Sequence, residues 1–484
     1  MTITIVGLGP GDAALLTREA WETLTGANEI YLRTARHPTV AGLPDSLVVH
    51  SFDDVYEQTA DFAQVYELIA EKVLTLGARS EGVVYAVPGH PCVAEATVSH
   101  IRARAKERGL NVKLVAGLSF IEPALQALGL DALPHLQLAD ALELAGRHHP
   151  LLHPDAPALI AQVYSPAIAA DVKLTLMNQY PDEHPVTLIH TASTVDERVE
   201  HLPLYEIDRS EHIAHLTALY VPPLAHLSAL ETFQNTIAHL RAPDGCPWDR
   251  EQTHQTLRTN LLEETYEVLA ALDADDVDAM REEVGDLLLQ IVLHAQIALE
   301  YGEYSMAEVI AGINEKIIRR HPHVFGDVKV NGVADVLTNW EKLKAAERAA
   351  NGKPDKKHNG TLGEVPPTLP ALMQAETYQR RAARVGFDWP DVSGVKAKVL
   401  EEIAEVETAD DLEDEVGDLL FAVVNWARWL NVEPESALRR ANTKFATRFA
   451  QVEAAAEAQG KVMKEMTLGE LDELWEKAKG GLEN

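Results

Sequence analysis

The chain has 484 residues, and its 75 acidic against 42 basic side chains give a formal net charge of −33 at pH 7. At roughly 100–200 residues per domain, this length predicts about three or four domains. The acidity argues against a protein that binds nucleic-acid polymers or anionic membrane surfaces, because clustered Lys and Arg hold both ligands. Cys92 and Cys246 are too few for a disulfide framework, and no leader or membrane-spanning run is apparent, so we expect a cytoplasmic protein.

Residues 1–222 alternate short β-rich runs with helix-like segments, which predicts an α/β domain with a largely parallel sheet. Several runs are apolar throughout, as in strands that are buried on both faces. The expected strands are Ile3–Val6, Glu29–Leu32, Val83–Val87, Val112–Val115, Ala158–Val163, Thr187–His190 and Leu219–Val221. The expected helices include Asp12–Leu24, Gln64–Thr75 and Ala94–Glu107. Two prolines at 222 and 223 end the pattern.

Three loops that follow expected strands are rich in glycine and proline: IVGLGPGD at 5–12, YAVPGHPC at 85–92 and AGLSF at 116–120. Glycine permits positive φ and a close approach of the backbone to a ligand. The first loop lacks the GxGxxG spacing of a dinucleotide site. Loops at the carboxyl ends of parallel strands predict a ligand crevice at that edge of the sheet.

Together these loops resemble the tetrapyrrole methylase family over roughly residues 1–222. The resemblance implies two α/β subdomains with S-adenosylmethionine bound between them. His90 stands where the family usually has an acidic residue, and QVYSPAIAADVKLTLM at 162–177 is similar to the YabN-like variant that is fused to MazG domains. The family's ligand-loop positions fall on Gly7, Gly9, Pro10, Gly89, Pro91, Gly117 and Ser119.

From Leu224 onward the sequence reads as helix. The expected helices are Leu227–Leu240, His254–Leu272, Val277–Tyr301, Met306–Arg320 and Val336–Ala350, and helical periodicity resumes from Leu369 to Leu482. Residues 351–367, which include GKPDKKHNG, predict a linker. We therefore expect a first helical domain at 224–350 and a second at 368–484, which we call the first copy and the second copy.

The two helical copies repeat each other. Four blocks recur in the same order: LEETYE at 262–267 and LEEIAE at 400–405, EVGDLL at 283–288 and 415–420, NEK at 314–316 and NTK at 442–444, WEKLK at 340–344 and WEKAK at 475–479. An arginine follows the third block in each copy, at 320 and 448. The chain is therefore predicted to be one α/β domain followed by two copies of one helical domain.

The repeated acidic residues predict a hard-cation site. Glu264 and Glu267 are three residues apart and share a helix face, as do Glu283 and Asp286 on the next expected helix. Apolar residues flank both acidic pairs, which argues against a helix face that is simply exposed to solvent. Carboxylates on facing helices are a usual way to bind Mg²⁺, which substrate phosphates then help to coordinate. The basic blocks would contact those phosphates.

Residues 224–484 resemble the MazG family of nucleoside triphosphate pyrophosphohydrolases in its tandem form, a resemblance that GCPWD at 245–249 and HPHVFGD at 321–327 strengthen. It implies an all-α fold, usually dimeric, that hydrolyses a nucleoside triphosphate to the monophosphate and pyrophosphate. The implied Mg²⁺ ligands are Glu264, Glu267, Glu283 and Asp286 in the first copy and Glu402, Glu405, Glu415 and Asp418 in the second. Glu263 and Glu401 are candidates to orient or deprotonate the attacking water. The implied substrate contacts are Lys316, Arg320, Trp340, Lys344, Lys444, Arg448, Trp475 and Lys479.

Alternatives remain open at this level. The chain could be an S-adenosylmethionine-dependent methyltransferase whose helical half is a dimerisation or nucleotide-sensing module, or a sensor without turnover. The copies also differ, because 15 residues separate Glu267 from Glu283 whereas nine separate Glu405 from Glu415, so one copy alone could be active. The sequence contains no GxxxxGK[ST] motif of a P-loop enzyme and no HExxH or paired CxxC motif of a zinc site.

Overall fold

The computed structural model describes residues 1–59, 62–350, 362–363 and 365–480. The contacts within the chain divide it into two units, Met1–His239 and Leu240–Asn484. Most of the linker predicted at 351–367 lies outside the described residues, and the domain boundaries therefore stay predictions. Among the described helices, none combines the length and the apolar character that a membrane span needs.

The first unit begins with a five-stranded parallel sheet in the order β3-β2-β4-β1-β5. Its core strands are apolar on both faces because helices cover both of them. Side chains of α3 and α4 pack on one face, and those of α1 pack on the other. The strands are β1 (Thr2–Gly7), β2 (Glu29–Leu32), β3 (Val48–Ser51), β4 (Val83–Val87) and β5 (Asn111–Val115). The helices are η1 (Ala13–Leu15), α1 (Arg18–Thr25), η2 (Pro38–Gly42), α2 (Asp53–Gln58), α3 (Phe62–Gly77) and α4 (Ala96–Glu107).

Two of the expected helices start later than the sequence pattern indicated. The segment expected as one helix at 12–24 is a short 3₁₀ helix, for which the Asp12 side chain accepts a hydrogen bond from the Ala14 amide, followed by α1 with Thr17 as its N-cap. Ala94 has a φ of 52°, and α4 begins only after Glu95, whose carboxylate accepts from the Thr97 amide. Side-chain caps therefore set both boundaries.

A second sheet, in the order β6-β7-β10-β8-β9, completes the first unit. Only β6 and β7 run parallel in it, whereas β10 is antiparallel to both β7 and β8, and β8 to β9. The expected parallel pairing therefore holds throughout the first sheet and, in the second, only for β6 and β7. The strands are β6 (Gln137–Asp140), β7 (Ala158–Ala161), β8 (Pro185–His190), β9 (Arg198–Pro203) and β10 (Thr217–Val221). The helices are α5 (Ile121–Leu128), α6 (Ala141–Ala145), α7 (Pro166–Leu176) and η3 (Leu204–Arg209), and α8 (Leu230–Arg241) spans the boundary between the units.

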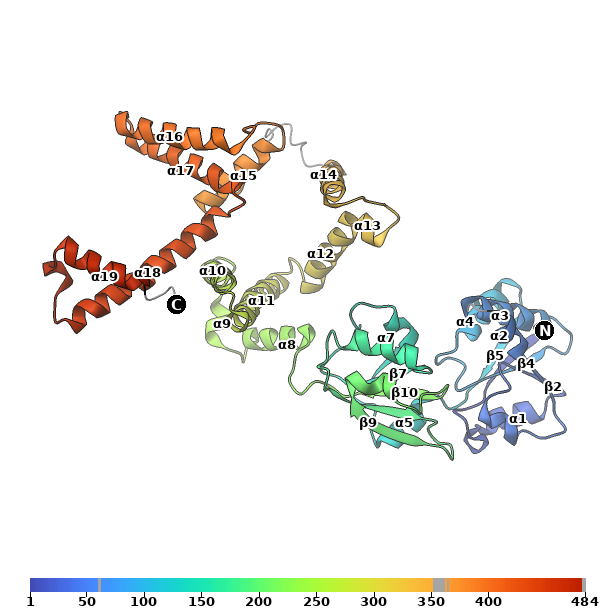
Figure 1. Ribbon diagram of the computed structural model, residues 1–484. Helices are drawn as coiled ribbons and strands as arrows, with labels where there is room; N and C mark the ends of the chain where they lie inside the picture. The colour runs from blue at the N-terminus through green and yellow to red at the C-terminus, as the bar shows by residue number, and fades with distance from the viewer. Residues whose placement is uncertain (60–61, 351–361, 364, 481–484) are drawn as a thin grey trace. The chain divides into compact units, whose positions relative to one another are not determined.

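Among the described residues of the second unit, the regular secondary structure is all helical. Two helix pairs dominate it, α10 against α11 in the first copy and α16 against α17 in the second (Figure 1). The first copy contains α9 (Pro247–Glu251), α10 (Arg258–Ala274), α11 (Val277–Glu300), α12 (Met306–Arg320), α13 (Pro322–Phe325) and α14 (Val333–Ala350). The second contains α15 (Ala371–Ala383), α16 (Val392–Thr408), α17 (Leu412–Trp429), α18 (Pro434–Ala458), η5 (Met463–Glu465) and α19 (Leu468–Gly480).

Candidate active site

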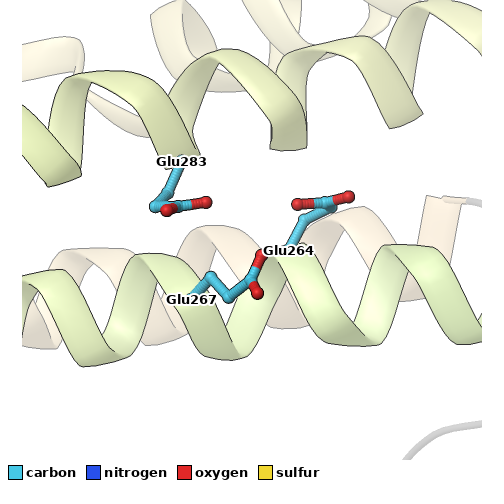
Figure 2. A group of neighbouring side chains, drawn as sticks. All are labelled: Glu264, Glu267 and Glu283. Carbon is cyan, nitrogen blue, oxygen red and sulfur yellow. The ribbon is translucent and has the colours of Figure 1, made fainter.

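In the first copy, the α10–α11 pair brings three carboxylates together. Glu264 and Glu267 extend from one helix and Glu283 extends from its neighbour, so that their side chains meet between the two helices (Figure 2). One oxygen from each carboxylate lies within 4.8 Å of the others. Asp286 is outside this group of three. The helical spacing that predicted a shared face therefore holds for Glu264 and Glu267, and the pairing of the helices adds Glu283.

Like charges at this spacing disfavour ionisation. The pKa of Glu264 is raised above its ordinary value. The removal of its carboxyl group from water is the largest cause, and the neighbouring charges of Asp286 and Glu267 come next. The pKa of Glu283 is also raised, first by removal from water and then by the charge of Glu267. A bound cation would relieve this repulsion, because it favours the charged form of every carboxylate around it.

In the second copy, α16 contributes Glu402 and α17 contributes Glu415 and Asp418 to a group of three carboxylates, again with one oxygen of each within 4.8 Å of the others. Glu405 is outside this group. The pKa of Glu415 is raised, first by the removal of its own carboxyl group from water and then by the charge of Glu405. Glu402 is buried, and its Oε2 atom has no hydrogen-bond partner. A buried carboxylate oxygen without a partner is costly unless a ligand satisfies it, so the group fits a cation.

Lys398 approaches the acidic side chains of the second copy. Its Nζ atom lies 2.7 Å from Glu401 Oε1, 2.8 Å from Glu402 Oε1 and 3.9 Å from Glu405 Oε2. The hydrogen bonds to Glu401 and Glu402 raise the pKa of the ammonium group. The sequence reasoning missed this residue, although a lysine four residues before Glu402 on a helix was a visible signal.

The two residues predicted to act on water have different surroundings. In the first copy, Glu263 and Glu267 line a surface hollow together with Arg258, Leu262 and Tyr266. In the second, Glu401 is paired with Lys398, as described above.

Two of the predicted substrate-contacting side chains of the first copy, Arg320 and Trp340, lie together. Arg320 is ion-paired with Glu347, with 2.6 Å between Nη2 and Oε2, and its guanidinium lies 5.3 Å from the centre of the Trp340 ring. Arg319 also pairs with Glu347, at 2.9 Å. The arginine hydrogen bonds lower the pKa of Glu347 to about 2. Glu347 was not predicted from the sequence, because nothing in the motif spacing connects it to an arginine 27 positions earlier.

The equivalent residues of the second copy have other partners. The Nε atom of Arg448 is buried without a hydrogen-bond partner. Trp475 packs against Phe445 with 5.2 Å between ring centres, and Lys479 pairs with Glu476. Within the described parts of both copies, no hydrogen bond or ion pair joins the predicted substrate contacts to the carboxylate groups, and this holds for Lys316, Lys344 and Lys444 as well.

In the first unit, the three predicted ligand loops pack backbone against backbone. They follow β4, β1 and β5, which are adjacent in the sheet. Gly9 and Gly89 form a bridge, and a Cβ atom added at Gly7 would lie 2.5 Å from the Gly89 carbonyl oxygen and 2.7 Å from the Gly117 amide nitrogen. Pro10 and Pro91 are buried in the same loops. Ser119 Oγ donates to Glu122 at 2.6 Å, so its hydroxyl is used within the protein.

Comparison with known proteins agrees with this organisation. Residues 2–208 match the model of the tetrapyrrole (corrin/porphyrin) methylases, and residues 252–325 match the MazG nucleotide pyrophosphohydrolase domain. The chain is 43% identical over 489 residues to the uncharacterized protein YabN of Bacillus subtilis, which covers 99% of this chain and 98% of that protein. The chain belongs to the YabN-like family.

This YabN-like chain thus joins two kinds of domain. The helical half of this one is 48% identical over 254 residues to the nucleoside triphosphate pyrophosphohydrolase/pyrophosphatase MazG of Thermotoga maritima, covering 52% of this chain and 96% of that protein. It is 43% identical over 262 residues to the nucleoside triphosphate pyrophosphohydrolase of Escherichia coli K12, covering 52% and 98%. This YabN-like chain is accordingly an enzyme with MazG-like pyrophosphohydrolase and tetrapyrrole-methylase-like domains.

Proposed function

We propose that the helical half hydrolyses nucleoside triphosphates with Mg²⁺, adding water across the bond between the α- and β-phosphates to give a nucleoside monophosphate and pyrophosphate. The observation that carries this proposal is the recurrence of a three-carboxylate group between paired helices in both copies. Acidic groups are common on protein surfaces, but the pKa of Glu264 in the first group and that of Glu415 in the second are raised, and Glu402 has a buried oxygen without a partner. Those features support a cation site.

Glu264, Glu267 and Glu283 would hold the ion in the first copy, and Glu402, Glu415 and Asp418 in the second. Bound Mg²⁺ supplies neutralisation of the triphosphate and polarisation of the phosphorus that is attacked. Glu263 and Glu401, each next in sequence to a ligand, would accept the proton of the attacking water. The basic residues would bind phosphate oxygens, and Trp340 or Trp475 would stack on the base.

Pyrophosphate release from a panel of ribo- and deoxyribonucleoside triphosphates tests this proposal. Glu264→Gln and Glu402→Gln each remove a ligand charge from one copy, and the double variant is expected to lose at least 99% of the rate, roughly the loss that follows removal of a metal. Glu407→Gln, an exposed position on α16 outside the group, is the matched control and should keep the wild-type rate. Wild-type protein that releases no pyrophosphate, or a double variant as fast as wild type, would contradict the proposal.

We further propose that the first unit binds S-adenosylmethionine at the carboxyl edge of its parallel sheet, where the loops after β1, β4 and β5 meet. Loops at that edge of an α/β sheet are the usual ligand position. Calorimetry with S-adenosylmethionine tests the idea, and an absence of heat at millimolar ligand would contradict it. The finding of binding without pyrophosphate release would favour the alternative, a methyltransferase with a helical dimerisation or sensing module.

A homodimer formed through the helical half completes the proposal. On α12, the side chains of Ile310, Ile313 and Ile317 are exposed on one face, and α10 exposes Leu262 and Tyr266. Exposed apolar stripes of this kind are usually covered by another surface. Light scattering on the purified protein should give twice the mass of one chain.

The free cysteines Cys92 and Cys246 fit the reducing cytoplasm expected from the sequence.

A further inference from the structure

The two copies differ at one position that faces their carboxylates. Lys398 lies four residues before Glu402, which places it one helical turn away on the same face of α16. The repeat aligns it with Asn260 of α10, four residues before Glu264. Both positions are partly buried. The second copy therefore has a cationic side chain where the first has a neutral one.

The contacts show what this difference does. The Lys398 ammonium is within 2.8 Å of Glu402, a member of the three-carboxylate group, and also contacts Glu401 and Glu405. In the described part of the first copy, no Lys, Arg or His forms an ion pair with the corresponding residues Glu263, Glu264 and Glu267. One acidic set thus has a cation of its own helix ion-paired to it, whereas Arg258 of α10 lines a hollow with Glu263 and Glu267 but, among the described residues, forms no ion pair with them.

The contact with Lys398 matters because Glu402 is buried. Its side chain is only 5% exposed, and a buried carboxylate is destabilised by several kcal/mol unless a positive charge or hydrogen bonds compensate it. Lys398 provides such compensation for Glu402 Oε1, whereas Glu402 Oε2 stays without a partner. An incoming metal ion would have to share Glu402 with the ammonium, whose charge repels it, or displace the ammonium.

We propose that Lys398 is an internal counter-cation that competes with the divalent metal for the carboxylates of the second copy. The two copies then bind metal with unequal affinity, the first tightly and the second weakly, although the EExxE and ExxD blocks that supply their ligands are alike. This inference rests on the proposed metal-dependent function. The inference applies to the protein before nucleotide binds. It attributes the difference in metal affinity between the two copies to the side chain of Lys398.

Titration of the full-length, nucleotide-free protein with Mn²⁺, followed by electron paramagnetic resonance and calorimetry, tests the inference. Wild-type protein should show two classes of site. Lys398→Met keeps the length of the side chain, removes its charge, and should tighten the weak class by about tenfold or more. The reciprocal variant Asn260→Lys should weaken the tight class by a similar factor. Lys398→Arg retains the charge and should leave the weak class weak.

Assignment of the classes uses the ligand variants. Glu264→Gln should abolish the tight class, and Glu402→Gln should abolish the weak one. If Lys398→Met does not fold, as far-ultraviolet circular dichroism would reveal, Asn260→Lys decides the matter, because it adds the same cation to the other copy. A reduced affinity of the first copy in that variant supports the inference, and an unchanged affinity overturns it.

The failure of this inference can be told apart from failure of the proposed function. Equal affinity at both sites in wild type, or no change in either reciprocal variant, would overturn the role of Lys398 while Mg²⁺-dependent pyrophosphate release continued. Absence of Mn²⁺ binding alongside such release would overturn it as well. Absence of pyrophosphate release under all metal conditions would contradict the proposed function itself.

Discussion

Replacement of Gly7 by alanine should destabilise the first unit through the packing of its three loops. The added Cβ would lie 2.5 Å from the Gly89 carbonyl oxygen, 2.7 Å from the Gly117 amide nitrogen and 2.8 Å from the Gly117 Cα. All three atoms belong to backbone, which cannot rotate away as a side chain could. Overpacking costs about 1–3 kcal/mol, and contacts with backbone alone indicate the upper end, ~3 kcal/mol.

Differential scanning calorimetry measures this effect. A loss of ~3 kcal/mol in a unit the size of Met1–His239 lowers Tm by roughly 6–12 °C. Gly285→Ala is the matched control: it lies within α11, nothing is within 4 Å of its added Cβ, and alanine should stabilise the helix by about 0.5–1 kcal/mol. If Gly7→Ala melted within about 1 °C of wild type, the three loops would not be held by backbone contact, and the reasoning would be wrong.

Three further predictions concern the helical half. The pKa of Glu347 is lowered from 4.5 to about 2 by Arg320 and Arg319, so the stability that this carboxylate contributes is present above pH 4.5 and lost as the pH falls toward 2. Acid titration of Tm should therefore show wild type above Glu347→Gln at pH 6, with the two curves meeting near pH 2. The pKa of Glu283 is raised, so Glu283→Gln should melt above wild type in EDTA at pH 7, by a margin that shrinks as the pH is lowered; an equal or lower Tm would contradict the repulsion inferred there. Ser305 forms a capping box at the start of α12, and urea denaturation of Ser305→Ala should report a loss of about 1 kcal/mol, whereas an unchanged midpoint would count against the cap.

Apolar pattern predicted the buried elements of the fold well and the edge strands poorly. The interior strands β1, β4, β8 and β10 were expected within one or two residues of their ends, because both of their faces are covered. The strand β3 was missed because its residues are largely exposed, and β9 because its sequence, RVEHLP, is polar. Hydrogen bonds to a neighbouring strand hold such segments in the sheet, and the amino-acid composition of a segment gives little indication of those bonds.

The site was predictable along each helix but not across helices. Spacing of three residues placed Glu264 beside Glu267 because it is a property of one helix. Which carboxylates meet the neighbouring helix depends on the register of the pair. Four ligands were predicted in each copy, and Asp286 and Glu405, whose roles stay predictions, are not among the three whose oxygens lie within 4.8 Å of one another. The contact between Arg320 and Glu347 joins two helices and was likewise beyond the reach of local pattern.

The lengths of the two helical hairpins explain how the copies tolerate different connections. Helix α10 continues seven residues beyond Glu267 and α11 starts six before Glu283, whereas α16 continues three beyond Glu405 and α17 starts three before Glu415. Each arm of the second hairpin is therefore shorter by about one turn of helix. Because the arms run in opposite directions, the loss of one turn from both keeps the EExxE block of one helix opposite the ExxD block of the other. The tip of such a hairpin can lengthen or shorten during evolution, by one turn in each arm, without separating the carboxylates that lie further from the tip.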